Sequence, residues 1–317
     1  MRWRKRRGGE ERPAAGEAVE GVLDASGYAD CSRVWLSVGD SLPVLDVEVT
    51  GRELLPMLGD LGARLPRGWD LVATTRWAPH DAAAIERQLQ NRNEFAWAHH
   101  VGFGPEPASF GADDLIDAAA SWTDEAIDRR FAAQESDRDA MRTWQHHEVI
   151  DYHLAATLNA VGTAPGQEAI PAAIPTEAAL DRWLLDWELE NATPPRDRVQ
   201  DWFEVGTPDQ PLVIRIFPRT APFAAIAIEH WWASDMPFAL AAMQRWQRRY
   251  GARLIAHFGT MLHIVSSTCP TDLEEAWGLA REQHLLCDAL LEPSGEARRH
   301  LALGLMHEPR WFLHSRP

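Results

Sequence analysis

The chain has 317 residues, of which 45% are hydrophobic and 25% are charged, a composition typical of a globular protein with one large or two medium domains. The formal net charge of −16 repels phosphate backbones, so we expect no nucleic-acid binding by the main fold. No apolar run approaches the roughly 18–20 residues that span a bilayer, and no apolar signal segment follows the basic start. We therefore expect a cytoplasmic protein without a membrane span.

The three cysteines, Cys31, Cys269 and Cys287, are far apart in the chain and form no Cys-x-x-Cys pair. This pattern favours reduced thiols over a disulfide framework and does not suit a thiolate zinc site, so no cofactor is expected. Lys5 is the only lysine, and this bias towards arginine, together with the abundant alanine, indicates a bacterial genome rich in G and C.

Residues 1–20 begin with a basic run and continue into a segment rich in Gly, Glu, Pro and Ala. Such a segment offers little apolar surface to bury, so we predict that it is a disordered basic tail. Its charge suits an anionic partner, in contrast to the acidic body that follows it.

The region 21–162 alternates strand and helix signals, as a small α/β-like N-terminal domain does. Runs rich in β-branched residues predict strands, and apolar residues at helical spacing predict helices. The predicted strands span 33–38, 43–49, 70–75 and 94–101. The predicted helices span 52–65, 79–91, 113–131 and 138–161.

Residues 163–175 are rich in Gly, Pro and Ala without periodicity, which predicts a linker before a C-terminal domain at 176–317. Thr176 is expected to cap the first helix of that domain, and Gly251 is expected to end another. The predicted helices span 176–190, 236–250, 271–291 and 296–306. The predicted strands span 212–217, 224–230, 253–258, 261–266 and 311–313. Strands paired as hairpins predict an α+β fold, with an antiparallel or mixed sheet and helices packed on one face.

An ordered series of residues in the last third of the chain carries a family resemblance. The matching positions are Trp232, Pro237, Trp246, Arg249, Tyr250, Gly251, Ala252, Ala276, Leu279, Ala280, Arg281, Glu282, Gln283, Cys287, Trp311 and Phe312. In this order they resemble the domain-of-unknown-function family 4253, over about the final hundred residues. The family often carries Asn and Cys between its loop Trp and Pro, whereas this chain has residues 233–236 without either. The resemblance implies a shared fold and no established activity.

The fifteen tryptophans are well above the usual share; most are expected in the core, and a minority are expected to line a recognition surface. Trp231, Trp232 and Asp235 lie where a predicted strand gives way to a loop, a common position for binding residues. Glu282 and Gln283 sit in the middle of a predicted helix and are expected beside that loop. We therefore predict that these five residues form a binding site.

The densest polar cluster lies in the predicted helix 138–161. At 100° per residue, His147 falls in the middle of an apolar face marked by Ile150, Leu154 and Leu158, and Asp151 follows one turn later. A histidine and a carboxylate at this spacing can share a proton or supply two metal ligands, although a buried structural pair has the same spacing. His146 and His153 are expected on the opposite, solvent-facing side.

Two functions follow from these patterns. The first is a non-enzymatic protein- or ligand-binding module, favoured by the acidic charge, the surplus of tryptophan and the lack of a catalytic motif. The alternative is a metal-assisted hydrolase or lyase centred on His147 and Asp151.

Overall fold

The computed structural model describes twelve stretches of the chain, which are residues 4–5, 14–38, 42–49, 54–75, 112–142, 146–172, 174–192, 212–229, 235–258, 261–287, 290 and 297–315. The predicted helix at 79–91 and strand at 94–101 lie outside these ranges, as do Trp231 and Trp232. The side chain of His147 also lies outside the described part, although its backbone belongs to a helix.

Within the described residues the strands form one mixed sheet of eight, in the order β1-β2-β3-β5-β4-β6-β7-β8. Neighbouring strands run antiparallel except β4 and β6, which are parallel. The strands are β1 (Arg4–Lys5), β2 (Arg33–Val38), β3 (Leu42–Val49), β4 (Asp70–Thr75), β5 (Leu212–Phe217), β6 (Arg253–Phe258), β7 (Met261–Val265) and β8 (Arg310–His314).

The helices connect and cover these strands. They are α1 (Ala14–Ala25), α2 (Leu54–Arg64), α4 (Ala112–Ala120), α5 (Asp124–Arg142), α6 (His146–Val161), α7 (Glu177–Asn191), α8 (Ala224–Glu229), α9 (Met236–Tyr250), α10 (Leu273–Leu286) and α11 (Arg298–Leu305), with a short 3-10 turn at Gln167–Ala169. No helix in the described ranges has both the length and the apolar character needed to cross a membrane. The fold is α+β, as predicted.

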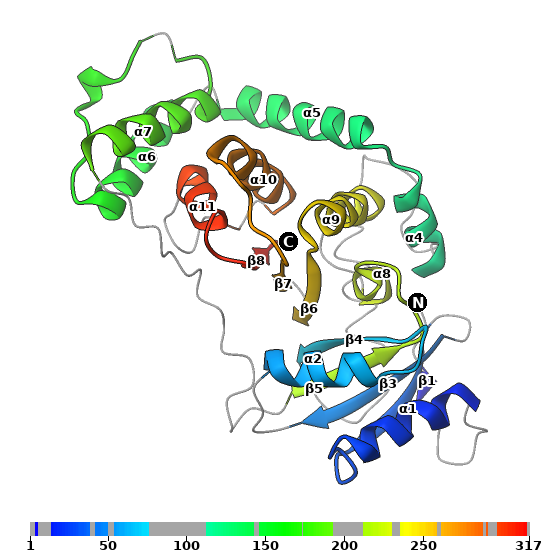
Figure 1. The fold of residues 1–317 in the computed structure, drawn as a ribbon. Coiled ribbons are helices and arrows are strands. Elements are labelled where there is room, and N and C mark those ends of the chain that lie inside the picture. The colour runs from blue at the N-terminus through cyan, green and yellow to red at the C-terminus, as the bar shows by residue number, and fades with distance from the viewer. Residues whose placement is uncertain are drawn as a thin grey trace.

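Two apolar clusters lie on the two faces of the sheet. Helices α1 and α2 pack on one face against alternate residues of β3, β4, β5 and β6. Helices α4, α5 and α8 to α11 pack on the other face and form the larger cluster. Figure 1 shows these two helical layers on opposite sides of the strands, with α5 running across α9 and α10 on the side away from the sheet. Helices α8 to α11 of the C-terminal half therefore share one face, as predicted, whereas no described residue of α7 belongs to either cluster.

The sheet does not divide at the expected linker. Strand β5 follows residues 163–175 in sequence, but it pairs with β3 on one side and β4 on the other, and both of these strands precede that segment. Strand β6 is joined to β4 as well. The expected boundary between 21–162 and 176–317 therefore passes through a single sheet and does not separate two cores.

The prediction of a disordered tail over residues 1–20 is wrong for Arg4–Lys5, which form β1 and pair with β2, and for the second part of the segment. Helix α1 begins at Ala14, and Val19 and Leu23 on it are fully buried in the smaller cluster. Glu20 accepts a hydrogen bond of 2.7 Å from Trp35 Nε1. Residues four apart on one helical face supplied enough apolar surface to order a segment whose composition favoured disorder.

Two other predictions are corrected by local geometry. The run at 224–230 is not a hairpin strand but contains helix α8, since a short apolar run such as Ala-Ala-Ile-Ala-Ile carries no period that distinguishes a buried helix from a buried strand. At the start of α10 the capping residue is Asp272, whose carboxylate accepts from the Glu275 N–H at 2.9 Å, and the helix ends at Leu286.

Two predicted helix ends are confirmed. Thr176 Oγ1 accepts a hydrogen bond of 3.1 Å from the Ala179 N–H at the start of α7. Gly251 ends α9 in the left-handed conformation, with φ of 64°. Thr176 fixes the point at which the chain enters α7, and Gly251 turns the chain from the end of α9 towards β6.

Candidate functional site

Several of the residues that carry the family resemblance belong to the larger apolar cluster, among them Trp246, Tyr250 and Trp311. Trp246 on α9 and Trp311 on β8 make an edge-to-face contact with ring centroids 6.2 Å apart, and Tyr250 contacts Trp311 at 5.8 Å. Each of these three rings is at most 4% exposed. They join a helix to the sheet, so their first role is to hold the fold together.

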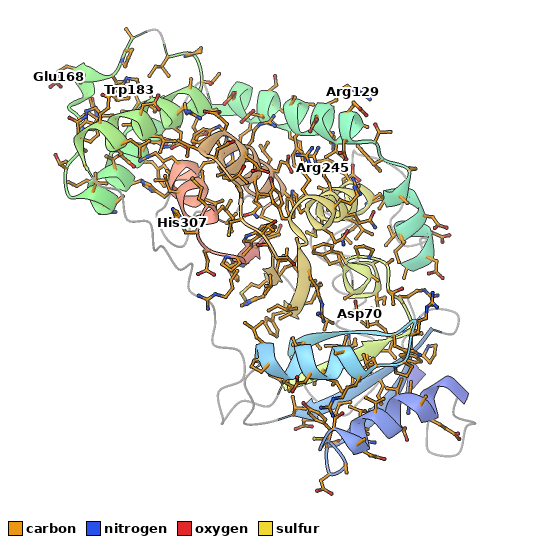
Figure 2. The ribbon with its side chains drawn as sticks, in the orientation of Figure 1. Asp70, Arg129, Glu168, Trp183, Arg245 and His307 are labelled. Carbon is orange, nitrogen blue, oxygen red and sulfur yellow. The ribbon has the colours of Figure 1, made fainter. Side chains whose placement is uncertain are left out.

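Glu282 forms the polar centre of this region. Its carboxylate accepts a hydrogen bond of 2.7 Å from Trp246 Nε1 and lies 2.6 Å from Arg245 Nη2. Arg245 is fully buried and also donates to Asp128 on α5 at 2.5 Å. Figure 2 shows Arg245 where α9 faces α5. Glu282 thus connects α9, α10 and, through Arg245, α5.

Gln283 is fully buried, in contrast to its predicted place beside a binding loop. Within the part of the chain that the structure describes, neither polar atom of its amide has a hydrogen-bond partner. Glu282 is only 8% exposed, and its oxygens are already engaged. Neither residue lies at the surface, so the predicted binding surface does not extend onto this face of α10.

The described end of the predicted binding loop lies at the start of α9. The Asp235 carboxylate caps this helix by accepting from the Phe238 N–H at 3.2 Å. Its second oxygen lies 3.7 Å from Nη2 of Arg130 on α5. The Arg130 guanidinium stands over the Phe238 ring at 5.9 Å, and Trp122 packs on the same ring at 5.3 Å. Arg130 therefore lies over a buried aromatic ring and beside the capping carboxylate of Asp235, and both charged side chains are partly exposed.

The predicted phase of α6 is wrong. Asp151 is exposed and accepts a hydrogen bond of 2.7 Å from Gln167 Nε2. Leu158, expected on the buried face, is 52% exposed, whereas His153, expected in solvent, is 3% exposed. The buried side of this helix includes the polar residues His153 and Thr157. A prediction based on the spacing of apolar residues therefore assigns the wrong face to the interior.

That polar side meets a network that sequence reasoning missed. Arg299 on α11 is fully buried, bonds both Asp181 and Glu188 on α7, and donates to Thr157 Oγ1 at 2.7 Å. His153 Nε2 lies 3.1 Å from Glu177 Oε1. The partners are up to 146 residues apart in sequence, so no short-range spacing of charged residues could predict these contacts.

The network strongly perturbs its acidic members. Burial alone would raise the pKa of Asp181, but the hydrogen bond from His153 and the nearby Arg299 hold that pKa well below its usual range. Burial likewise opposes ionisation of Glu188, and His300 and Arg299 outweigh it and lower its pKa. Both carboxylates are therefore ionised at neutral pH, in an interior that a lone charge would not enter.

A second set of ion pairs continues the network along the helical layer. Glu135 on α5 bonds Arg281 at 2.6 Å and Arg298 at 2.7 Å, which joins α5 to α10 and α11. Arg298 Nε also lies 3.4 Å from Nδ1 of His284. Burial, together with the charges of Arg138 and Arg298, keeps the pKa of His284 well below its ordinary value, so His284 is neutral.

Metal binding was the second candidate chemistry. Among the described residues no three His, Cys, Asp or Glu side chains are arranged to hold a metal ion. Asp151 binds Gln167 and not a histidine, and the His147 side chain lies outside the described part. The pairing of His147 with Asp151 stays a prediction.

Residues 213–314 match the family model described as a domain of unknown function (DUF4253). The match confirms the predicted resemblance and runs from β5 to β8. It includes α9, α10 and α11, but not α5, α6 or α7, whose side chains complete the networks around Arg245 and Arg299. No curated protein and no solved structure matches the chain.

Proposed function

We propose that the protein is a cytoplasmic, non-enzymatic binding module of bacterial origin, which recognises a protein partner at the start of α9. The observation that carries this proposal is the partly exposed pair of Arg130 and Asp235, with the Arg130 guanidinium over the Phe238 ring. Arginine and aromatic side chains dominate the energetics of protein interfaces, because they offer large contact areas together with directed hydrogen bonds. Here both charged groups are held in place before any partner arrives.

The position of this pair in the chain adds support. Asp235 directly follows the segment 231–234, which contains Trp231 and Trp232. Through its cap on the Phe238 N–H, Asp235 fixes the point at which that segment enters α9. Trp231 and Trp232 therefore precede the described start of α9 by only a few residues of sequence.

Charge indicates the kind of partner. The net charge of −16 favours a protein with a basic surface, and attraction between opposite surfaces speeds association at low salt. Binding should weaken as salt is added, because the Debye length falls to about 8 Å at physiological ionic strength.

Capture of proteins from a bacterial lysate by purified bait protein tests the proposal. Asp235→Asn keeps a good helix cap but removes the charge, and Arg130→Ala removes the guanidinium. Arg129→Ala is the matched control, because Arg129 is the neighbouring exposed arginine on α5 (Figure 2). We expect the wild type and the control to retain the same basic protein, and the two site variants to retain at least about tenfold less. Equal capture by all four proteins would contradict the proposal.

The hydrolase or lyase alternative has a separate test. Elemental analysis of the purified protein would favour it if zinc, iron or manganese were present in stoichiometric amount and lost in His147→Ala. The described geometry of Asp151 does not favour this alternative, since its carboxylate is engaged by Gln167 at the surface.

A further inference from the structure

The hairpin formed by α6 and α7 carries most of the large apolar side chains that are exposed in the described residues. There are four such side chains, and three of them lie on this hairpin: Tyr152 and Leu158 on α6, and Leu189 on α7. The fourth is Leu55 on α2. Figure 1 shows the hairpin beside the end of α5 that is remote from α4. Exposed apolar side chains that gather on one element, unlike those scattered singly, indicate an interaction surface.

On α6 the exposed Leu158 belongs to a row of apolar side chains. Ile150, Leu154 and Leu158 follow one another at intervals of four residues, and Val161 continues the row. Residues at this spacing lie one above the other on a helix. Leu158 is 52% exposed, and the other three side chains are partly exposed. Apolar spacing predicts that this face is buried, and in the structure it is partly open to solvent.

The row is not the side by which α6 is attached to the fold. The buried side chains of α6 are His153, Ala156 and Thr157, about a quarter turn around the helix from the row. His153 bonds Glu177 on α7, and Thr157 accepts from Arg299 on α11. Among the described residues, no member of the row belongs to either apolar cluster over the sheet or packs against one. Helix α6 therefore has an apolar side in addition to the side that contacts α7 and α11.

The surface of the hairpin is acidic. Residues 146–192 contain eight Asp and Glu and one Arg. Two of the acids, Asp181 and Glu188, are buried against Arg299, and the single arginine, Arg182, is paired with Glu274 on α10. The exposed acids are Glu148, Asp151, Glu168, Asp186 and Glu190. The apolar row thus lies on an element whose exposed charges are negative.

The carboxylates nearest to the row lie along one of its borders. By helical periodicity Asp151 is next to Leu154 and Leu158 on the solvent side, and Glu148 lies one turn before Asp151. Gln167 donates to Oδ1 of Asp151, and a carboxylate can accept more than one hydrogen bond. An apolar row with an acidic border matches a helix whose own apolar row is bordered by basic side chains.

Other occupants fit this surface less well. An extended peptide gains affinity by pairing with an open strand edge, whereas the backbone groups of α6 are bonded within the helix. A second copy of this chain would bring the same acids against one another, and like charges across an interface oppose association. Anionic lipids and nucleic acids would be repelled for the same reason.

We infer that the apolar row of α6 is the docking surface for a basic amphipathic helix of another protein, which lies along α6 with its Arg or Lys residues against Asp151 and Glu148. This surface is on a different element from Arg130 and Asp235, so the inference does not depend on the proposed function. It also lies away from the ion pairs of Arg299, which are on the buried side of α6.

Titration of the full-length protein with a fluorescent synthetic helix tests this inference. The probe has about sixteen residues, the length of α6, with leucines at alternating spacings of three and four and arginines on both flanks. One control peptide has the same composition in scrambled order, and another has glutamate in place of arginine. We expect anisotropy at low salt to show saturable binding of the probe and at least about tenfold weaker binding of either control.

Two pairs of matched variants locate the bound peptide. Leu158→Gln changes the most exposed side chain of the row, and Leu55→Gln makes the same change in the exposed leucine of α2. We expect Leu158→Gln to weaken binding about five- to tenfold, because docking buries the exposed half of that side chain, and Leu55→Gln to have no effect. Glu148→Gln should weaken binding about threefold at low salt. Glu17→Gln, which also removes a first-turn glutamate, should not.

Three results would overturn the inference. Equal affinity of the wild type and Leu158→Gln for the probe would show that the row is not the docking surface. Equal binding of the scrambled peptide would show that charge alone attracts the probe. Sedimentation of the protein without peptide gives the third: a dimer that Leu158→Gln dissociates would mean that a second copy covers the row. A monomeric protein that binds the probe through Leu158 supports the inference.

Discussion

Glu282 and Gln283 are neighbours on α10 and are both buried, but their polar atoms differ in partners. The Glu282 carboxylate lies within 2.7 Å of Arg245 and Trp246. The Gln283 amide has no partner among the described residues. Removing one member of a buried ion pair leaves the other charge uncompensated, whereas removing an unpaired amide leaves nothing unsatisfied.

Substitution of each residue by methionine should therefore have opposite effects. We expect Glu282→Met to destabilise the protein by about 3–5 kcal/mol, because it leaves Arg245 and the Trp246 N–H without this acceptor. Gln283→Met should be neutral or stabilise by about 1–2 kcal/mol, because it removes buried polar atoms that form no hydrogen bond. Urea unfolding of both variants measures the difference. A cost above about 1 kcal/mol for Gln283→Met would show that its amide has a bonded partner in solution.

For single residues, the sequence indicated which ones belong to the buried region better than it indicated which side chains they contact. The family resemblance selected Trp246, Glu282 and Trp311, which the structure brings into one buried region. It did not select Arg299, whose carboxylate partners come from α7 outside the matched segment, or His153, which itself lies outside that segment, and buried charge produces no hydrophobic period. Burial of an arginine can be predicted only when the carboxylates that pair with it in the fold are already known.

Helices with strong end signals were predicted well, and those without them were not. Helix α9 was predicted at its observed ends, because its apolar residues keep the helical period and Gly251 stops it. Helix α8 has no side chain that caps its start in the described structure and was predicted as a strand. Helix α6 was predicted in the right place but with the wrong buried face, because its contact with α11 is polar.

The end of α9 provides a prediction at the scale of an element. Gly251 has φ of 64°, and a Cβ added there would lie 2.7 Å from Ser267 Oγ and 2.9 Å from Ser267 Cβ. Gly251→Ala should therefore destabilise by about 1–2 kcal/mol from the backbone alone, with a further cost for moving Ser267. Gly278→Ala is the matched control, because it lies inside α10 with open space around it and should stabilise by about 0.5–1 kcal/mol. Thermal unfolding compares them, and equal shifts would contradict the strained-turn explanation.

The sheet determines how the whole molecule divides. The sequence indicated the strands and their α+β class, but strand order could not be derived, since pairing of β5 with β3 and β4 depends on contacts between distant segments. The run Leu212–Phe217 is apolar apart from Arg215, which is typical of a strand buried on both faces but does not indicate which strands are its neighbours. The linker-like composition of residues 163–175 suggested that the segments before and after it fold as separate domains. The chain instead leaves the sheet after β4 and returns to its centre as β5.

The interleaved order leads to a prediction for the fragment 176–317. In the whole chain β5 is bonded on both edges by strands that the fragment lacks, and the parallel partner of β6 is lost with β4. The buried residues of β5 would lose α1 and α2 on one face, and α9 would lose Asp128 as the partner of Arg245. Since a domain is stable by only about 5–15 kcal/mol, these losses should leave the fragment without a cooperative fold. We expect its amides to exchange like those of an unfolded chain, and addition of the fragment 1–162 to restore protection in β5. A fragment 176–317 that unfolds cooperatively on its own, with protected β5 amides, would show that the matched segment has a core that does not need β3 and β4.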